Sequence, residues 1–255
     1  RQLGYFAIIA VAVIIGLVAI IYPKVNKEPT CFDGEMNGDE SGIDCGGSCQ
    51  KVCTAEALQL VTLWSRAFEV VPGKYNVMAY IENQNRESGI PSINYEFKMY
   101  DDNNIFIGRQ TGTAFITSND RTAIFEPGIL AGNRVPKRVT FSFTSAPQWI
   151  KINREQKNAL AVSSEDIELF DPLDSPKLEA QIVNKTLLDI HDLDVYAILY
   201  DAEDNVMTAS KTLVDLLPKN SKSGVVFTWP HPLSERPTRI DIFPQINVFE
   251  LNLDR

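Results

Sequence analysis

The chain has 255 residues, of which 24 are Lys or Arg and 33 are Asp or Glu, and its formal net charge is −9. This balance, with no basic run, excludes the electrostatic footprint of a nucleic-acid-binding protein. A hydrophobic content of 44% is normal for a globular protein and permits a buried core.

The N-terminal segment Leu3–Tyr22 is an unbroken apolar run without a charged residue. About 20 helical residues cover ~30 Å, the thickness of the hydrocarbon core of a bilayer. A cleaved signal peptide is the alternative, although its apolar region is usually shorter, at about 7–15 residues. The sequence therefore predicts an uncleaved transmembrane helix over residues 1–23, with Leu3–Tyr22 in contact with membrane lipid.

All cysteines of the chain lie in one short segment, at Cys31, Cys45, Cys49 and Cys53. Their spacing lacks the paired CxxC knuckles of a zinc site, so we expect two disulfides, and three pairings are open. The positive charges near the apolar run favour a cytoplasmic location for the residues that follow it, because Lys24 and Lys27 come after the run and only Arg1 precedes it. Disulfides require an oxidising compartment, and on that ground we predict a cysteine-rich knot at residues 24–54 on the extracytoplasmic side.

Oxygen-bearing side chains recur between the first two cysteines. They occupy positions 1, 3, 5, 7, 9 and 12 of a 12-residue run with glycine at position 6, namely Asp33, Glu35, Asn37, Asp39, Ser41 and Asp44. This pattern is close to that of a calcium loop, which makes calcium a candidate cofactor. The alternative is a set of turns, since Asp-Gly, Asn-Gly and Gly-Gly are common turn formers.

The same segment resembles a motif of bacterial surface and secreted proteins, C-x-DG-x-x-NG-x-E-(S/T)-x-x-DCGG-x-C-x-x-C. The matching residues are Cys31, Asp33, Gly34, Asn37, Gly38, Glu40, Asp44, Cys45, Gly46, Gly47, Cys49 and Cys53. The final spacing is one residue longer here. The resemblance implies an exported stalk module and no enzymatic activity.

After Cys53 the apolar residues follow the period of two that is typical of half-buried strands. In the first half we predict strands at Tyr75–Ile81, Asn94–Tyr100 and Val139–Phe143. In the second half Leu178–Asn184, Val195–Asp201 and Val225–Trp229 repeat them in that order, and Ile240–Ile242 repeats Ile150–Ile152. Such spacing indicates two tandem β-sandwich domains, at residues 55–160 and 161–255.

Two strand ends carry a shared signature. Phe97, Met99, Tyr100 and Asp101 in the first half, and Leu199, Tyr200 and Asp201 in the second, resemble the F-x-L-Y-D signature of FxLYD-type Ig-like domains. Ala197 stands where that signature has Phe. The resemblance implies Ig-like sandwiches in a prokaryotic envelope protein, similar to uncharacterised surface proteins of candidate-phyla bacteria. The predicted fold class is thus mainly β: a transmembrane α-helix, a disulfide-rich knot and two Ig-like sandwiches.

No residue pattern indicates catalysis. The two histidines, His191 and His231, do not form a metal-ligand spacing, and no CxxCH, GxSxG or GxxxxGK[ST] motif occurs. Trp149 follows a Pro-Gln turn and is a candidate for an exposed contact. We therefore expect a protein that is not an enzyme.

The predicted function is that of a membrane-anchored, extracytoplasmic structural or interaction protein whose two sandwiches bind an unknown protein or envelope component. The alternatives are a pilin-like filament subunit and an accessory or sensor subunit of an envelope complex. The sequence leaves the partner and the oligomeric state open.

Overall fold

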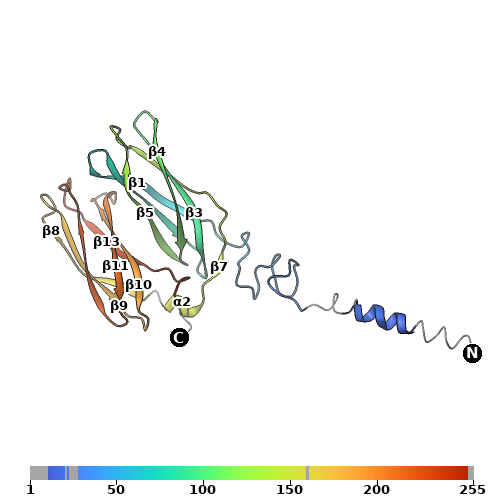
Figure 1. The fold of residues 1–255 in the computed structure, drawn as a ribbon. Coiled ribbons are helices and arrows are strands. Elements are labelled where there is room, and N and C mark those ends of the chain that lie inside the picture. The colour runs from blue at the N-terminus through green and yellow to red at the C-terminus, as the bar shows by residue number, and fades with distance from the viewer. Residues whose placement is uncertain (1–10, 21, 23–27, 159–160, 252–255) are drawn as a thin grey trace, which may run out of the picture. The chain divides into compact units, whose positions relative to one another are not determined.

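The structure is a computed structural model that describes residues 11–20, 22, 28–158 and 161–251. The chain divides into two units, Arg1–Cys53 and Thr54–Arg255. The second unit contains all the strands of the described residues, and most of its elements are labelled in Figure 1.

The strands of this unit form two successive groups. The first group is β1 (Val61–Val71), β2 (Lys74–Asn83), β3 (Ser88–Tyr100), β4 (Phe106–Ile116), β5 (Asp120–Leu130), β6 (Arg138–Phe143) and the short β7 (Ile150–Lys151). The helix α2 (Arg154–Asn158) leads to the second group, which is β8 (Val162–Phe170), β9 (Lys177–Asn184), β10 (Ile190–Tyr200), β11 (Val206–Leu217), β12 (Lys222–Thr228) and β13 (Arg239–Gln245).

Both groups pair their strands in the same order. The first forms the sheets β1-β2-β5 and β4-β3-β6, with β7 beside β3, and the second forms β8-β9-β12 and β11-β10-β13. All these pairs are antiparallel. The second group is therefore a copy of the first, except that no described strand corresponds to β7.

This order corrects part of the predicted repeat. Val225–Trp229 was aligned with Val139–Phe143, but β12 has the sheet position of β5, and β13 has that of β6. The prediction missed β5, so the alignment skipped one strand of the first copy. The prediction also missed β8, which lies at the start of the second predicted domain.

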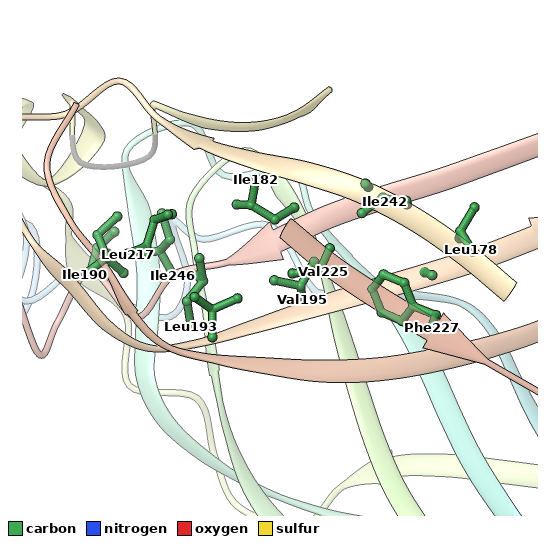
Figure 2. Packing of buried hydrophobic residues seen from close by; sticks show 14 of the residues in the cluster. Leu178, Ile182, Ile190, Leu193, Val195, Leu217, Val225, Phe227, Ile242 and Ile246 are labelled. Carbon is green, nitrogen blue, oxygen red and sulfur yellow. The ribbon is translucent and has the colours of Figure 1, made fainter. Parts of the chain in front are cut away.

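The core of the second sandwich lies between its two sheets. Leu178 and Ile182 of β9 and Phe227 of β12 pack against Val195 of β10 and Ile242 of β13, and Figure 2 shows these side chains gathered between the strands. Leu178, Ile182 and Val195 are completely buried. Alternate residues of each strand supply this core because successive side chains point to opposite faces of a sheet.

Strands β2 and β10 are buried on both faces, where the sequence predicted half-buried strands. Their second faces meet in a separate cluster that joins the two sandwiches. It consists of Phe68, Met78, Tyr80, Ala123, Tyr196, Ile198, Tyr200, Val206 and Ala209, with Trp64, Phe125 and Phe243 at its border. The sheet β1-β2-β5 therefore packs directly on the sheet β11-β10-β13, and the two sandwiches share an apolar interface.

The two outermost sheets of this stack carry polar residues at the corresponding positions. Glu179 and Gln181 of β9 take the places that Met78 and Tyr80 have in β2, at an offset of 101 residues. In β3, Glu96 and Lys98 form an ion pair where β10 has Tyr196 and Ile198. The apolar contact is thus confined to the one interface between the sandwiches.

The predicted transmembrane part of the fold class is wrong. Among the described residues, no helix is long and apolar enough to cross a membrane. Residues 11–20 and Tyr22 are helical, and ten helical residues rise only about 15 Å. The remainder of the predicted span, residues 1–10, 21 and 23, lies outside the described residues.

Candidate binding surfaces

The cysteine-rich segment is closed by two disulfides, as predicted. Cys31 pairs with Cys49, and Cys45 pairs with Cys53, which selects one of the three open pairings. A segment this short has almost no apolar core, so these cross-links supply the restraint that packing supplies elsewhere.

The six oxygen-bearing residues of the candidate calcium loop mostly satisfy backbone and neighbouring side-chain donors. The Asp33 carboxylate accepts hydrogen bonds from Asn37 Nδ2 (3.1 Å) and from the Glu35 N–H (3.0 Å), and these bonds lower the pKa of Asp33. The Asp44 carboxylate accepts the Gly34 N–H at 3.0 Å, and Asp39 accepts the Ser48 hydroxyl at 2.8 Å. Ser41 donates its backbone N–H to the carbonyl of Cys45. These bonds close the loop onto itself.

Glu40, which the sequence placed in the surface-protein motif but not among the candidate calcium ligands, contacts several groups of this loop. The Glu40 carboxylate accepts the backbone N–H groups of Asn37 and Asp44 and contacts the Cys31–Cys49 disulfide. Within the described residues, Cys31, Glu40 and Cys49 form the only His, Cys, Asp or Glu group close enough to share a metal ion, and both sulfurs are already in the disulfide.

The Gly46-Gly47 pair is required by close packing. Gly47 has φ +50°, and a Cβ at this position would overlap the carbonyl group of Asp39. A side chain cannot be accommodated without displacing backbone, which explains why the chain has glycine after Cys45.

The Tyr-Asp signature residues build the same turn in both sandwiches. Asp101 Oδ1 accepts the N–H groups of Asn103 and Ile105, and Asp201 Oδ1 accepts those of Glu203 and Asn205. Each aspartate therefore closes the hairpin loop that follows its strand. The role of these residues is structural.

The other signature residues also stabilise the fold. Phe97, Met99 and Leu199 are completely buried. The guanidinium of Arg138 lies 4.1 Å from the ring centroid of Tyr100, and Arg239 lies 3.5 Å from that of Tyr200. The signature thus marks a hairpin and its buried strand.

A buried asparagine at the end of a strand has an equivalent role in both copies. Asn83 Nδ2 donates to the carbonyls of Ser88 and Thr117, and its Oδ1 accepts the Asn85 N–H. Asn184 Nδ2 donates to the carbonyls of Leu188, Leu217 and Pro218. Each asparagine joins three chain segments at one end of its sandwich.

Polar contacts reinforce the apolar interface between the sandwiches. The amide of Gln245 on β13 accepts the Ala123 N–H at 2.8 Å and donates to the Ala123 carbonyl at 3.2 Å. Arg66 Nη1 donates to the Val206 carbonyl at 3.0 Å. Desolvation in this interface raises the pKa of Tyr80 to about 12. The sequence analysis did not predict that any of these residues lies in an interface. The sequence signal for it was the continuous apolar runs of β2 and β10, which are typical of strands buried on both faces.

One groove among the described residues has a volume of about 970 Å³. The run from Leu187 to Asp194, including His191, forms one wall, and Phe115, Lys219 and the segment Gln245–Leu251 complete it. A smaller groove of about 380 Å³ lies beside Phe68 and the Trp229–Ser234 segment, which includes His231. Trp149, predicted to be exposed, is only 2% exposed.

Comparison with models of known protein families finds no match, and comparison with curated proteins finds none either. Among solved structures, red sea bream transglutaminase is similar over 74% of this chain and 29% of that protein, with 9% identity and a TM-score of 0.24. The tandem CBM22-1–CBM22-2 domain of Paenibacillus barcinonensis Xyn10C is similar over 80% of this chain and 92% of that protein, with 8% identity and a TM-score of 0.17. The chain thus spans less than a third of the transglutaminase, and scores this low carry no argument about its fold or function.

Proposed function

We propose that this chain is an extracytoplasmic interaction protein whose two joined sandwiches form one rigid frame for binding a partner. The observation that carries the proposal is the apolar interface in which Tyr80 and Tyr196 both contact Phe243. Tandem domains usually move relative to one another unless their interface is large and hydrophobic. Loops and grooves held on a rigid frame are suited to recognition.

The two disulfides support the extracytoplasmic location, since such bonds persist in oxidising compartments. A pilin-like filament subunit and an accessory or sensor subunit of an envelope complex are the alternatives. No contact among the described residues favours either of them over a binding frame.

The proposal is tested by photo-crosslinking in producing cells. A photoreactive phenylalanine analogue is placed at one position at a time. Two positions lie in the grooves, Leu187 in the large one and His231 in the small one. The other two are exposed residues of strands, Leu130 at the end of β5 and Val226 on β12 of an outer sheet. We expect a discrete crosslinked envelope component from at least one position, and all four cysteines protected from thiol reagents in intact cells. Crosslinks at none of the four positions, or free cysteines in cells, would contradict the proposal.

We propose that the loop of residues 33–44 binds calcium, and the observation that supports this is one buried oxygen atom. Asn37 Oδ1, at position 5 of the loop, is a buried acceptor without a donor among the described residues. Calcium favours such amide oxygens. Calorimetric titration of the full chain is expected to show calcium binding that Asn37→Ala weakens and Lys51→Ala leaves unchanged. Equal affinity in both variants, or no heat at millimolar calcium, would reject it.

A further inference from the structure

Three cations of the first sandwich line one groove of about 430 Å³ beside the contact between β1 and β6. They are Arg66 on β1, Lys137 just before β6, and Arg138, the first residue of β6. Among the described residues, none of the three forms an ion pair with a carboxylate. The rest of the lining of this basic groove is uncharged and consists of Ser65, Ala67, Pro136 and Val139.

Both guanidinium groups are held in place by partners that do not neutralise them. Arg66 Nη1 donates to the Val206 carbonyl at 3.0 Å. Arg138 Nε donates to Asn104 Oδ1 at 3.2 Å, and its guanidinium stacks on the ring of Tyr100. A guanidinium has five N–H donors, so each arginine keeps donors for a ligand. Because these groups are already oriented, binding orders them at a lower entropic cost.

One carboxylate lies within electrostatic range of the basic groove. Arg66 favours the ionised form of Asp201, but no ion pair joins the two. Asp201 accepts the N–H groups of Glu203 and Asn205 in its own turn. It therefore offsets the positive charge of the groove only in part.

The second sandwich has an arginine at the place of Arg138, but that arginine is neutralised. Arg239 is the first residue of β13, as Arg138 is of β6, and each stacks on the tyrosine of its strand-end signature. Arg239 forms ion pairs with Asp204, at 2.7 Å, and with Asp241. Two carboxylates thus balance its charge and leave little attraction for another anion.

The first sandwich has neutral residues where these two aspartates stand. Asn104 takes the turn position of Asp204, with the same left-handed backbone, and Thr140 takes the position of the other aspartate. The β1 position differs as well, since Arg66 pairs with β2 at the rung where Glu168 of the second sandwich pairs with β9. Three differences between the copies all make this one place more positive, and together they point to an anionic ligand.

We propose that the basic groove binds a phosphate group of an envelope component. The inference deepens the proposed binding function and rests on it. The fork of N–H groups on a guanidinium matches two phosphate oxygens, and Lys137 adds a third positive charge. A terminal phosphate carries about −1.5 to −2 charges at pH 7, so three cations favour it over a carboxylate.

The test titrates the full chain with inorganic pyrophosphate in calcium-free buffer at low salt, and calorimetry measures the affinity. We expect a dissociation constant in the micromolar to millimolar range that rises with added salt. Lys137→Gln should weaken binding about two- to fivefold. Asn104→Asp combined with Thr140→Asp gives Arg138 the two carboxylates of the second sandwich and should weaken binding at least about tenfold.

Lys219→Glu is the matched control, because it changes the net charge by the same amount as the two added aspartates but lies outside the basic groove. Its affinity should stay within about twofold of the parent's. Vesicles of phosphatidylcholine with and without phosphatidic acid identify the source of the phosphate. Retention of the chain only with phosphatidic acid assigns the phosphate to a lipid, and pyrophosphate binding without retention assigns it to a soluble or polymeric component.

Three results would overturn the inference. The first is no heat of binding at millimolar pyrophosphate, and the second is an affinity in the two-aspartate variant no lower than that of Lys219→Glu. The third is tighter binding of a glutamate-rich peptide than of pyrophosphate, which would assign the groove to an acidic protein segment. The photo-crosslinking positions lie outside the basic groove. Failure here therefore leaves that test of the binding frame intact, and the two failures are distinguishable.

Discussion

Tyr80 of the first sandwich lies against Phe243 of the second, with ring centroids 5.6 Å apart. Phe243 in turn stacks on Tyr196 at 5.5 Å, so three rings connect the sheet β1-β2-β5 with the sheet β11-β10-β13. The stability of each sandwich therefore depends on the other.

Replacing Tyr80 with Ala is expected to destabilise both sandwiches. Removing a large buried ring costs about 3–5 kcal/mol when the site does not collapse, and this ring contacts both halves. Hydrogen-exchange mass spectrometry should show faster exchange in β9 and β12 as well as in β2. Val226→Ala on an exposed face should change stability by less than about 0.5 kcal/mol. Exchange that rises only in the first sandwich would show that the halves are independent.

Asn184→Ala should be among the more damaging single substitutions in the second sandwich. It leaves the carbonyls of Leu188, Leu217 and Pro218 without this donor, and an unsatisfied buried polar group costs about 1–3 kcal/mol. Chemical denaturation measures the loss. Asn94→Ala serves as the control because the Asn94 side chain is exposed and, among the described residues, bonds only Thr113. Similar losses in both variants would contradict the role assigned to the buried asparagine.

Acid should weaken the first sandwich through Asp101. The Ile105 N–H donates to the Asp101 carboxylate, and with Arg134 and the Asn103 N–H it holds the pKa of this carboxyl below its usual value. A folded-state pKa below the unfolded value of about 3.9 means that the contribution is complete above that pH. It is lost as the pH falls through the folded pKa. Asp101→Asn should flatten this acid limb in a plot of Tm against pH, and an unchanged limb would exclude Asp101 as its source.

Gly47→Ala should prevent the native disulfides from forming, because its Cβ would overlap the Asp39 carbonyl group. The matched control is Gly34→Ala, since Gly34 also has a positive φ (+76°) but nothing lies within 4 Å of its Cβ position. Mass mapping of non-reduced peptides should find Cys31–Cys49 and Cys45–Cys53 in the control and scrambled pairs in Gly47→Ala. Native pairs in both proteins would show that the backbone adjusts.

The strand pattern and the disulfide-rich knot could be predicted from sequence because each depends on local spacing. Residues 77–81 form a short apolar run that follows the turn at Gly73, and such a run locates a strand whatever packs on its faces. The interface between sandwiches could not be predicted in the same way. Whether Tyr80 faces water or Phe243 depends on a residue more than 150 positions away.

The calcium-loop pattern shows that residue spacing alone does not determine what a carboxylate binds. Asp33 and Asp44 have the spacing of metal ligands, yet in the structure their carboxylates accept backbone N–H groups. Spacing alone does not distinguish these two uses of a carboxylate, because both require oxygen atoms that point into a tight loop.

The polar residues on the outermost sheets limit how far this architecture can grow. The interface joins two different sheets, so in principle each module offers one surface of each kind, and a series of modules could continue without end. Glu179 and Gln181 at one extremity, and Glu96 and Lys98 at the other, make further addition unfavourable because an incoming sheet would have to desolvate them. Duplication of such a module is therefore safe from open-ended addition only while its two terminal surfaces stay hydrophilic.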